Sequence, residues 1–153
     1  LVGPGIPDTY QGTEFFDFSL VDPDNRRFVD YAARSAAAGS PEDVAKQRVV
    51  REALALRRER PQLFLDGGYA GVFAEGDASQ HVVGMARTGD GEAEVIALAT
   101  REPLALERDG GWRGTAVTLP DGIWTDSFSG CTYSGRVPMA ELCAELPVAL
   151  LSR

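Results

Sequence analysis

Residues 40–61 read SPEDVAKQRVVREALALRRERP, and this stretch predicts a long helix. Ser40 is a preferred N-cap residue, Pro41 suits the first helical position, and the acidic residues that follow face the positive end of the helix dipole. Apolar side chains then recur at intervals of three and four residues, at Val49, Val50, Ala53, Leu54 and Leu56. Pro61 lacks a backbone donor and is expected to end the helix. We therefore expect a helix over residues 41–60 with one apolar face.

After residue 61 the pattern changes to short apolar runs separated by Gly, Asp and Pro. Runs of this length and spacing are typical of antiparallel strands joined by short turns. The expected strands lie near residues 69–73, 81–86, 95–99, 115–119, 123–128 and 146–151, with a helical turn near 139–144 before the last strand. This spacing favours an antiparallel β-sandwich of Greek-key type.

The residues before the helix show no periodicity. Residues 1–7 are apolar and interrupted by Gly and Pro, as in a strand that turns into a loop. Residues 8–30 are aromatic and acidic, and within them residues 21–27 (VDPDNRR) combine turn formers with two arginines. Long irregular segments in compact domains are commonly functional. We therefore expect a long loop over residues 8–30 that carries functional groups.

Composition narrows the class of protein. The chain has 153 residues, of which 44% are hydrophobic and 25% charged, which is enough apolar surface for a sizeable core. There are 15 basic and 23 acidic residues, and the resulting net charge of −8 repels phosphate backbones and anionic membrane surfaces. No apolar run approaches the roughly 18 residues of a membrane span. Neither nucleic acid nor a membrane is an expected partner.

The residues that commonly bind metals or nucleotides are sparse. Cys131 and Cys143 have no metal-ligand spacing and predict two reduced thiols in a cytoplasmic protein. His81 is the single histidine, and we expect a surface or half-buried strand residue there, because a metal site needs three or four donors. The glycine pairs at 67–68 and 110–111 fit no phosphate-binding loop. The sequence therefore predicts no metal and no cofactor.

Two motifs in the first loop connect the chain to a known family. Residues 4–14 (PGIPDTYQGTE) are similar to the Gly-x-Pro-x-x-Tyr-x-Gly-x-Glu motif at the eighth barrel strand of alpha-amylase superfamily enzymes. Residues 18–27 (FSLVDPDNRR) resemble the signature LSLVDPDNRR of maltooligosyl trehalose synthases. The sequence departs from the family at Phe28, where Pro is usual, and at Phe15 and Phe16, where Leu-Trp is common. Weaker similarities at residues 54–61, 119–126 and 146–151 extend the resemblance over nearly the whole chain.

The resemblance implies a fold and an activity. It implies an α+β fragment in which residues 1–62 are the last strand-loop-helix unit of a (β/α)8 barrel and residues 63–153 are an antiparallel β-sandwich (Greek-key) C-terminal domain. The family is an isomerase group that converts the reducing-end alpha-1,4 bond of a maltooligosaccharide into an alpha,alpha-1,1 bond. Its catalytic carboxylates follow barrel strands four, five and seven, which would precede Leu1. We therefore expect no catalytic residue in this chain, and the rest of the barrel as its partner in cis.

Candidate sugar contacts lie in the first loop. Sugar sites need flat aromatic surfaces and planar or charged groups that bind pairs of hydroxyls. The residues of these types in the two motifs are Tyr10, Gln11, Asp24, Asn25, Arg26 and Arg27. For the charged members the alternative role is to brace the loop through salt bridges. Glu14 is expected to support the loop by accepting bonds from Arg26 or from backbone amides.

Two other functions remain open on the sequence. A carbohydrate-binding module would present exposed aromatic residues, for which Trp112 and Trp124 are candidates, although tryptophans of small β domains more often lie in the core. The chain also fits the C-terminal part of another alpha-amylase-type hydrolase. Only the signature at residues 22–27 argues against the latter reading.

Overall fold

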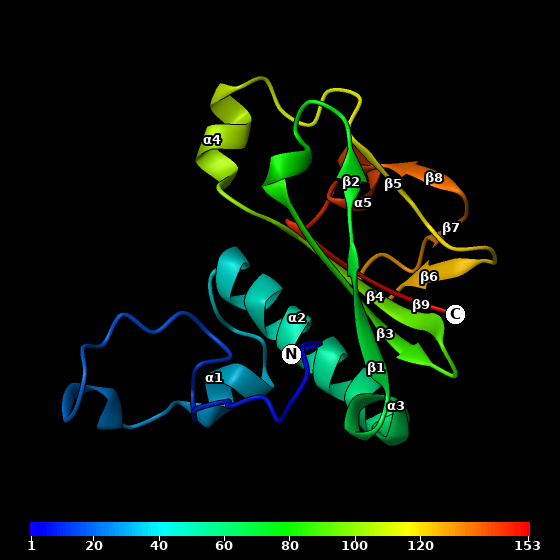
Figure 1. The fold of residues 1–153 in the computed structure, drawn as a ribbon. Coiled ribbons are helices and arrows are strands. Elements are labelled where there is room, and N and C mark those ends of the chain that lie inside the picture. The colour runs from blue at the N-terminus through cyan, green and yellow to red at the C-terminus, as the bar shows by residue number, and fades with distance from the viewer.

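The computed structural model describes residues 1–153, and its centre is an antiparallel six-stranded sheet (Figure 1). In spatial order the strands of this sheet are β1 (Gly68–Val72), β3 (Val82–Gly89), β4 (Glu92–Thr100), β9 (Val148–Ser152), β6 (Trp124–Asp126) and β7 (Thr132–Tyr133). A smaller antiparallel sheet contains β2 (Ala74–Glu75), β5 (Ala116–Thr118) and β8 (Arg136–Pro138). The expected antiparallel, mixed α and β architecture is confirmed.

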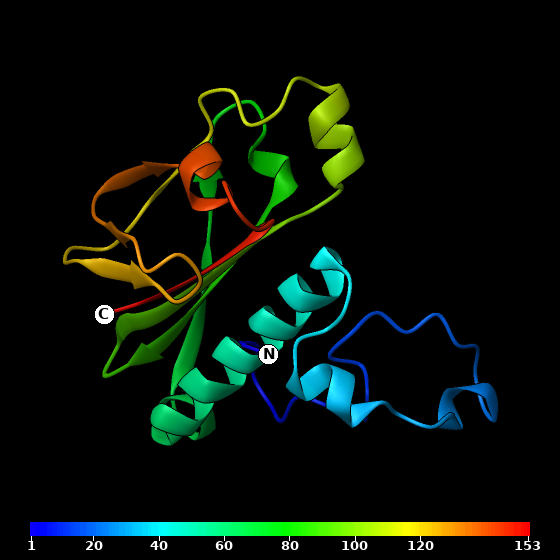
Figure 2. The same ribbon diagram turned by 180° about the vertical axis from the view of Figure 1, so that it is seen from behind.

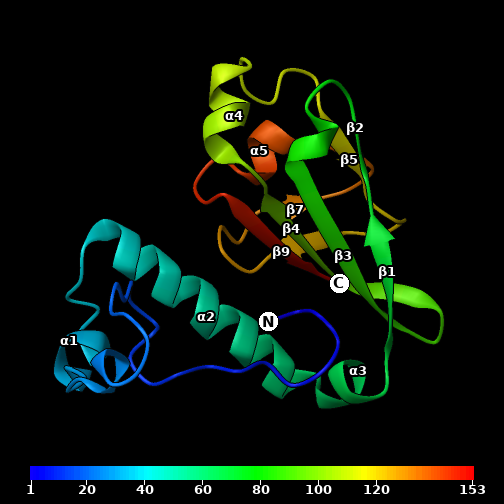
Figure 3. The same ribbon diagram turned by 60° about the vertical axis from the view of Figure 1, so that its left-hand side comes forward.

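The helices are unevenly distributed around the sheets. They are α1 (Tyr31–Ser35), α2 (Pro41–Glu59), α3 (Pro61–Leu65), α4 (Pro103–Arg108) and α5 (Met139–Leu142), with 3-10 turns η1 (Asp24–Arg26) and η2 (Ser79–His81). The long helix α2 separates the β-sheets from a lobe formed by the N-terminal loop and α1 (Figure 3). No helix combines the length and the apolar character that crossing a membrane requires.

Helix α2 begins as the sequence predicts. The Ser40 hydroxyl accepts a hydrogen bond from the Asp43 amide at 3.1 Å, and the Asp43 carboxylate accepts one from the Ser40 amide at 3.1 Å. This reciprocal capping box satisfies two backbone donors that the first turn of a helix leaves free. The helix ends at Glu59, and Pro61 opens the short helix α3. The expected helix over residues 41–60 is confirmed.

The six-stranded sheet has a separate core on each face. In β4, Val95 points towards α2 and forms a cluster with Ala53, Leu56 and Leu150, among others. Its neighbour Ile96 points to the other face, where the core between the two sheets holds Leu98, Val117, Trp124, Val137 and Leu151. Burying each large apolar side chain contributes roughly 1.5–3 kcal/mol. The sheet is therefore fixed on one side by α2 and on the other by the smaller sheet.

The six expected strands are confirmed, but several details differ. The two- and three-residue strands β2, β7 and β8 escaped the sequence pattern, and residues 1–7 form no strand. His81 lies in η2 and is only 3% exposed, so the expected surface or half-buried strand position is wrong. Its Nδ1 lies 3.0 Å from the Arg101 carbonyl oxygen, which satisfies one ring nitrogen. Cys131 is exposed and Cys143 half-buried, and both are free thiols.

Arg87 is a buried cation whose partners are all neutral. It lies in β3, is 2% exposed, and donates from one terminal nitrogen to the carbonyls of Leu63, Phe64 and Gly67 at 2.9–3.0 Å. These carbonyls are free because the short helix α3 ends there. Phe64 is also flanked by Arg57, whose guanidinium carbon lies 4.6 Å from the ring centroid. Arg87 thus joins α3 to the sheet.

Replacing Arg87 with Met should destabilise the chain. The substitution keeps the aliphatic volume but leaves the carbonyl cluster without its donor, which costs about 2–4 kcal/mol of unfolding free energy. Urea denaturation of the 153-residue chain measures this loss. The matched control is Arg136→Met, because Arg136 is exposed and donates a single hydrogen bond to Gly114. A loss below about 1 kcal/mol for Arg87→Met would contradict this account.

Asp43 also holds the N-terminal loop. Its Oδ1 accepts a hydrogen bond of 2.7 Å from the amide of Phe16, 27 residues earlier in the chain. The Phe16 amide and, to a smaller extent, the Ser40 hydroxyl and amide lower the pKa of the Asp43 carboxyl below its ordinary value. Because a lowered pKa reports stronger bonding to the charged form, the tether strengthens when Asp43 is ionised.

This tether should weaken in acid. Since the pKa of Asp43 is lower in the folded than in the unfolded chain, its stabilisation is complete above the unfolded value of about 3.9 and is lost as the pH falls through the folded value. A carboxyl carbon NMR titration should give a midpoint below about 3.9 for Asp43. Hydrogen exchange of the Phe16 amide should accelerate over the same range beyond its intrinsic pH dependence. Asp43→Asn should abolish that additional pH dependence, and its persistence in the variant would refute the assignment.

Candidate functional site

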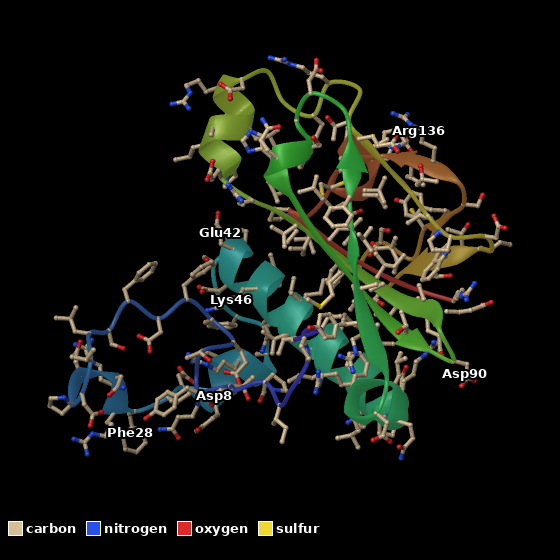
Figure 4. The ribbon with its side chains drawn as sticks, viewed as in Figure 1. Asp8, Phe28, Glu42, Lys46, Asp90 and Arg136 are labelled. Carbon is tan, nitrogen blue, oxygen red and sulfur yellow. The ribbon has the colours of Figure 1, made fainter.

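The loop that contains both motifs is held against the first half of α2 (Figure 2). Besides the bond from Asp43 to Phe16, the Lys46 ammonium donates to the carbonyl of Phe15 at 3.0 Å and lies 4.8 Å from the Phe16 ring centroid. Figure 4 shows Lys46 on the side of α2 that faces the loop. Phe15 is the one large apolar side chain of the loop that is buried. Polar bonds rather than a core therefore fix the path of the loop.

The second half of α2 holds the start of the chain. Arg57 donates one hydrogen bond to the carbonyl of Leu1 at 2.7 Å and another to the carbonyl of Gly5 at 2.9 Å. Val2 packs against the apolar cluster between α2 and the sheet. The chain therefore approaches the first motif from a fixed position.

A hollow of about 540 Å³ opens within the loop. It is lined by Tyr10, Thr13, Asp17, Ser19, Leu20, Val21 and Asn25. Two predicted sugar contacts, Tyr10 and Asn25, thus come together from the two motifs. The Oδ1 atom of Asn25 is buried and has no hydrogen-bond partner, while Tyr10 is 44% exposed. A buried polar atom without a partner is costly, and binding sites are a common reason for one.

The other four predicted contacts are engaged with neighbouring residues. Asp24 forms an ion pair with Arg27 and accepts a 2.8 Å hydrogen bond from the amide of Leu20. Arg26 lies 3.3 Å from Asp22, with both side chains well exposed. The Gln11 side-chain oxygen accepts a bond of 3.3 Å from the hydroxyl of Tyr31. The charged members therefore brace the loop in this structure, and none of the four lines the hollow.

Glu14 supports the loop through a residue that the sequence analysis missed. Its Oε2 lies 3.6 Å from the Nε of Arg34, whereas Arg26 pairs with Asp22 instead. Arg34 lies in α1, some 20 residues further along the chain, and no local spacing links it to the first motif. The spacing of Asp17 and Ser19, by contrast, is a signal for a local turn that could have been used, since Asp commonly binds backbone amides two residues later.

Two carboxyl groups of the loop, those of Asp17 and Asp24, favour their charged forms. Two hydrogen bonds from Ser19, at 2.6 Å from the hydroxyl and 2.9 Å from the amide, lower the pKa of Asp17. The amide of Leu20 and the side chain of Arg27 lower the pKa of Asp24. A general acid that works near neutral pH needs a raised pKa. Asp17 and Asp24 are therefore poor candidates for proton donation.

The outer surface of the loop is apolar. Phe16 and Phe18 stack with ring centroids 6.1 Å apart, and Phe18 is 90% exposed. Phe28, at one of the positions that depart from the family, is fully exposed and projects from the lobe (Figure 4). Leu20 and Val21 are also exposed. Clusters of this kind mark surfaces that bind other groups.

The chain is similar over its whole length to proteins of known name and structure. No family model matches the chain. The chain is 49% identical over all of its residues to proteins of two Mycobacterium tuberculosis strains that carry the name maltooligosyl trehalose synthase, and it spans 19% of their length. It superimposes on the maltooligosyltrehalose synthase of Arthrobacter ramosus with a TM-score of 0.87, at 44% identity, covering 99% of this chain and 20% of that one.

A more distant maltooligosyl trehalose synthase structure matches with a TM-score of 0.67 and 25% identity, again over 99% of this chain and 20% of the other. The matches include both motifs of the first loop, because they run along the whole chain. The resemblance inferred from the sequence is therefore confirmed. From end to end, the chain is homologous to about one fifth of a maltooligosyl trehalose synthase.

Proposed function

We propose that the chain is the C-terminal part of an intramolecular transglucosylase that forms maltooligosyl trehalose, and that its first loop shapes the sugar site. The observation that carries the proposal is the hollow where Tyr10 and Asn25 meet, within a segment that is homologous to maltooligosyl trehalose synthases. The substrate of the intact protein would be a maltooligosaccharide. Its partner would be the rest of the barrel in the same polypeptide.

We further propose that the chain is divided into two units. We assign residues 1–62 to the end of a catalytic (β/α)8 barrel and residues 63–153 to a Greek-key β domain. In such barrels the active site is built from loops at the carboxyl ends of the strands, and residues 8–30 would be the loop after the last strand. Helix α2 would be the last barrel helix, held to the β domain by the apolar cluster around Val95 and Leu150. The β domain would then stabilise the barrel.

The two predicted contacts in the hollow, Tyr10 and Asn25, suit a sugar in different ways. The ring of Tyr10 offers a flat apolar surface for the face of a glucose unit, and its hydroxyl can pair with a sugar hydroxyl. Asn25 also lines the hollow, and its side-chain amide is a group that can exchange hydrogen bonds with a sugar hydroxyl. The main role of Asp24, Arg26 and Arg27 would be to brace the loop. From the rim of the hollow, these three residues and Gln11 could also contact the substrate.

The bond rearrangement itself would depend on residues outside this chain. Breaking the alpha-1,4 bond and forming an alpha,alpha-1,1 bond with retention requires a carboxylate nucleophile and a carboxylic acid about 5 Å apart. In the loop Asp17, Asp24 and Glu14 are held by Ser19, Arg27 and Arg34, respectively. We therefore assign no catalytic residue to residues 1–153, and we expect this chain alone to be inactive.

A carbohydrate-binding module is the less favoured alternative. Trp124 is fully buried, and its ring nitrogen donates to the carbonyl of Pro120 at 2.8 Å. Trp112 packs against the core between the two sheets. The two tryptophans therefore form no exposed platform for sugar rings.

The full-length protein that contains this chain should rearrange maltopentaose without shortening it. Reducing ends should disappear while chromatography shows a product of unchanged size, because an alpha,alpha-1,1 bond blocks the reducing carbon. The control is the 153-residue chain, which should leave maltopentaose unchanged. Shorter sugars with new reducing ends would instead indicate a hydrolase and would refute the proposed reaction.

Truncating Asn25 should weaken substrate binding in the full-length protein. Asn25→Ala removes one hydrogen bond to the sugar and should raise KM for maltopentaose roughly tenfold, with little change in kcat, if the bond persists from ground state to transition state. The matched control is Gln62→Ala, since Gln62 is an exposed amide in α3, outside the loop. Equal KM values for both variants would remove Asn25 from the sugar site.

A further inference from the structure

Arg34 has more partners than any other side chain of the N-terminal lobe. Its Nε and one terminal nitrogen donate to the carbonyl of Gly12 at 3.1 and 2.6 Å, and the other terminal nitrogen donates to the carbonyl of Asp30 at 3.0 Å. The guanidinium also lies 3.6 Å from Glu14 and 4.8 Å from the ring centroid of Phe15. The side chain is only 18% exposed. The planar guanidinium contacts backbone carbonyls, a carboxylate and an aromatic ring at the same time. The ammonium group of a lysine could not make all of these contacts.

Arg34 is itself held in a fixed place. It lies in α1, whose first turn is capped by Asp30 through a 2.8 Å bond from the amide of Ala33. The backbone carbonyl of Arg34 accepts a 2.8 Å hydrogen bond from the side chain of Gln47 in α2. The guanidinium is therefore anchored to α2, and through α2 to the sheet.

Gly12 needs this contact because its backbone conformation is unusual. Its φ of +85° lies in the region that favours glycine, and a Cβ there would come within 2.9 Å of a methyl group of Val29. The turn that contains Gly12 is closed by Thr13, whose amide and hydroxyl both donate to the carbonyl of Tyr10, at 3.2 and 2.7 Å. In the same turn, Gln11 accepts the bond from Tyr31 of α1. Helix α1 thus holds the Tyr10–Gly12 turn at two points.

Tyr10 and Thr13 of this turn line the hollow, which Asn25 also lines. Tyr10 and Asn25 lie 15 residues apart in sequence, and little apolar packing fixes their separation, because most apolar side chains of the loop are exposed. The distance between Tyr10 and Asn25 therefore depends on where the Tyr10–Gly12 turn is fixed.

We propose that Arg34 is a positioning residue of the sugar site: its guanidinium fixes the Tyr10–Gly12 turn through the Gly12 carbonyl and Glu14, and so places Tyr10 in the hollow that Asn25 also lines, for binding a glucose unit. This inference rests on the proposed function and adds a residue that touches no sugar itself. Because Arg34 acts through Tyr10, the loss of Arg34 should weaken substrate binding by no more than the loss of Tyr10 does.

The test uses steady-state kinetics of the full-length protein on maltopentaose, with Arg34→Ala, Tyr10→Ala and the double variant. Arg34→Ala should raise KM about tenfold with kcat within about twofold of the parent, because misplacing a ground-state contact removes uniform binding. The double variant should have a KM close to that of the worse single variant, since Arg34 cannot position a ring that is absent. A purely structural role predicts instead a lower kcat through loss of folded protein, with unchanged KM.

Two further variants keep the test decisive. Arg34→Lys retains the charge and should fold, but it should recover only part of the affinity, and millimolar guanidinium chloride should lower the KM of Arg34→Ala without affecting the parent. Arg58→Ala is the matched control, because Arg58 is an exposed arginine of α2 with no hydrogen bond or ion pair. An unchanged KM in Arg34→Lys and Arg34→Ala, or a KM in the double variant equal to the product of both single effects, would overturn the proposal. If the parent itself fails to rearrange maltopentaose, the proposed function fails instead.

Discussion

The packing of α2 against the six-stranded sheet is the contact on which the rest of the molecule depends. Ala53 and Leu56 of the helix meet Val95 and Leu150 of two adjacent central strands, and all four are nearly inaccessible to solvent. Apolar burial of this kind supplies most of the free energy that holds a helix in place, since short helices are marginal in water by themselves. Because the sheet is braced from behind by the core that contains Trp124, the helix rests on a rigid surface.

The polar side chains of α2 have a different task. Asp43, Lys46, Gln47 and Arg57 hold the N-terminal segment, and each of them makes a hydrogen bond to one of its backbone groups. The loop buries little apolar surface of its own, so these bonds and the contacts of Arg34 determine its path. Helix α2 is therefore fixed by the hydrophobic core, and its polar side chains in turn fix the loop. The residues that line the hollow of the loop depend on this helix for their positions.

The sequence was informative where the physical signal is local. The capping box and the spacing of Val49, Ala53 and Leu56 predict α2, and apolar runs bounded by Gly and Pro predict the longer strands. The short strands β2, β7 and β8 were missed, whereas the three-residue strands β5 and β6 were found because they lie within longer apolar runs. A buried arginine such as Arg87 reads as a surface residue, because its carbonyl partners lie 20 or more residues away.

The same distinction applies to the candidate site. Tyr10 and Asn25 were selected through family motifs, and their meeting in one hollow could not be deduced from residues 15 apart in an aperiodic loop. Arg34 was missed, since its partners Gly12 and Glu14 lie some 20 positions earlier. His81 was misplaced because nothing in its neighbours predicts the 3-10 turn that buries it.

The two functions of α2 restrict how its length can vary among related chains. The loop is held mainly in the first turns, up to Gln47, and the apolar contacts with the sheet begin at Val49. One residue inserted between these positions would turn the first half of the helix by about 100° and move it by about 1.5 Å relative to the second half. The lobe would then be carried around the helix axis, away from its present place. Insertions and deletions should therefore be tolerated at the tip of the loop and in the β-turns, but not at this boundary within α2.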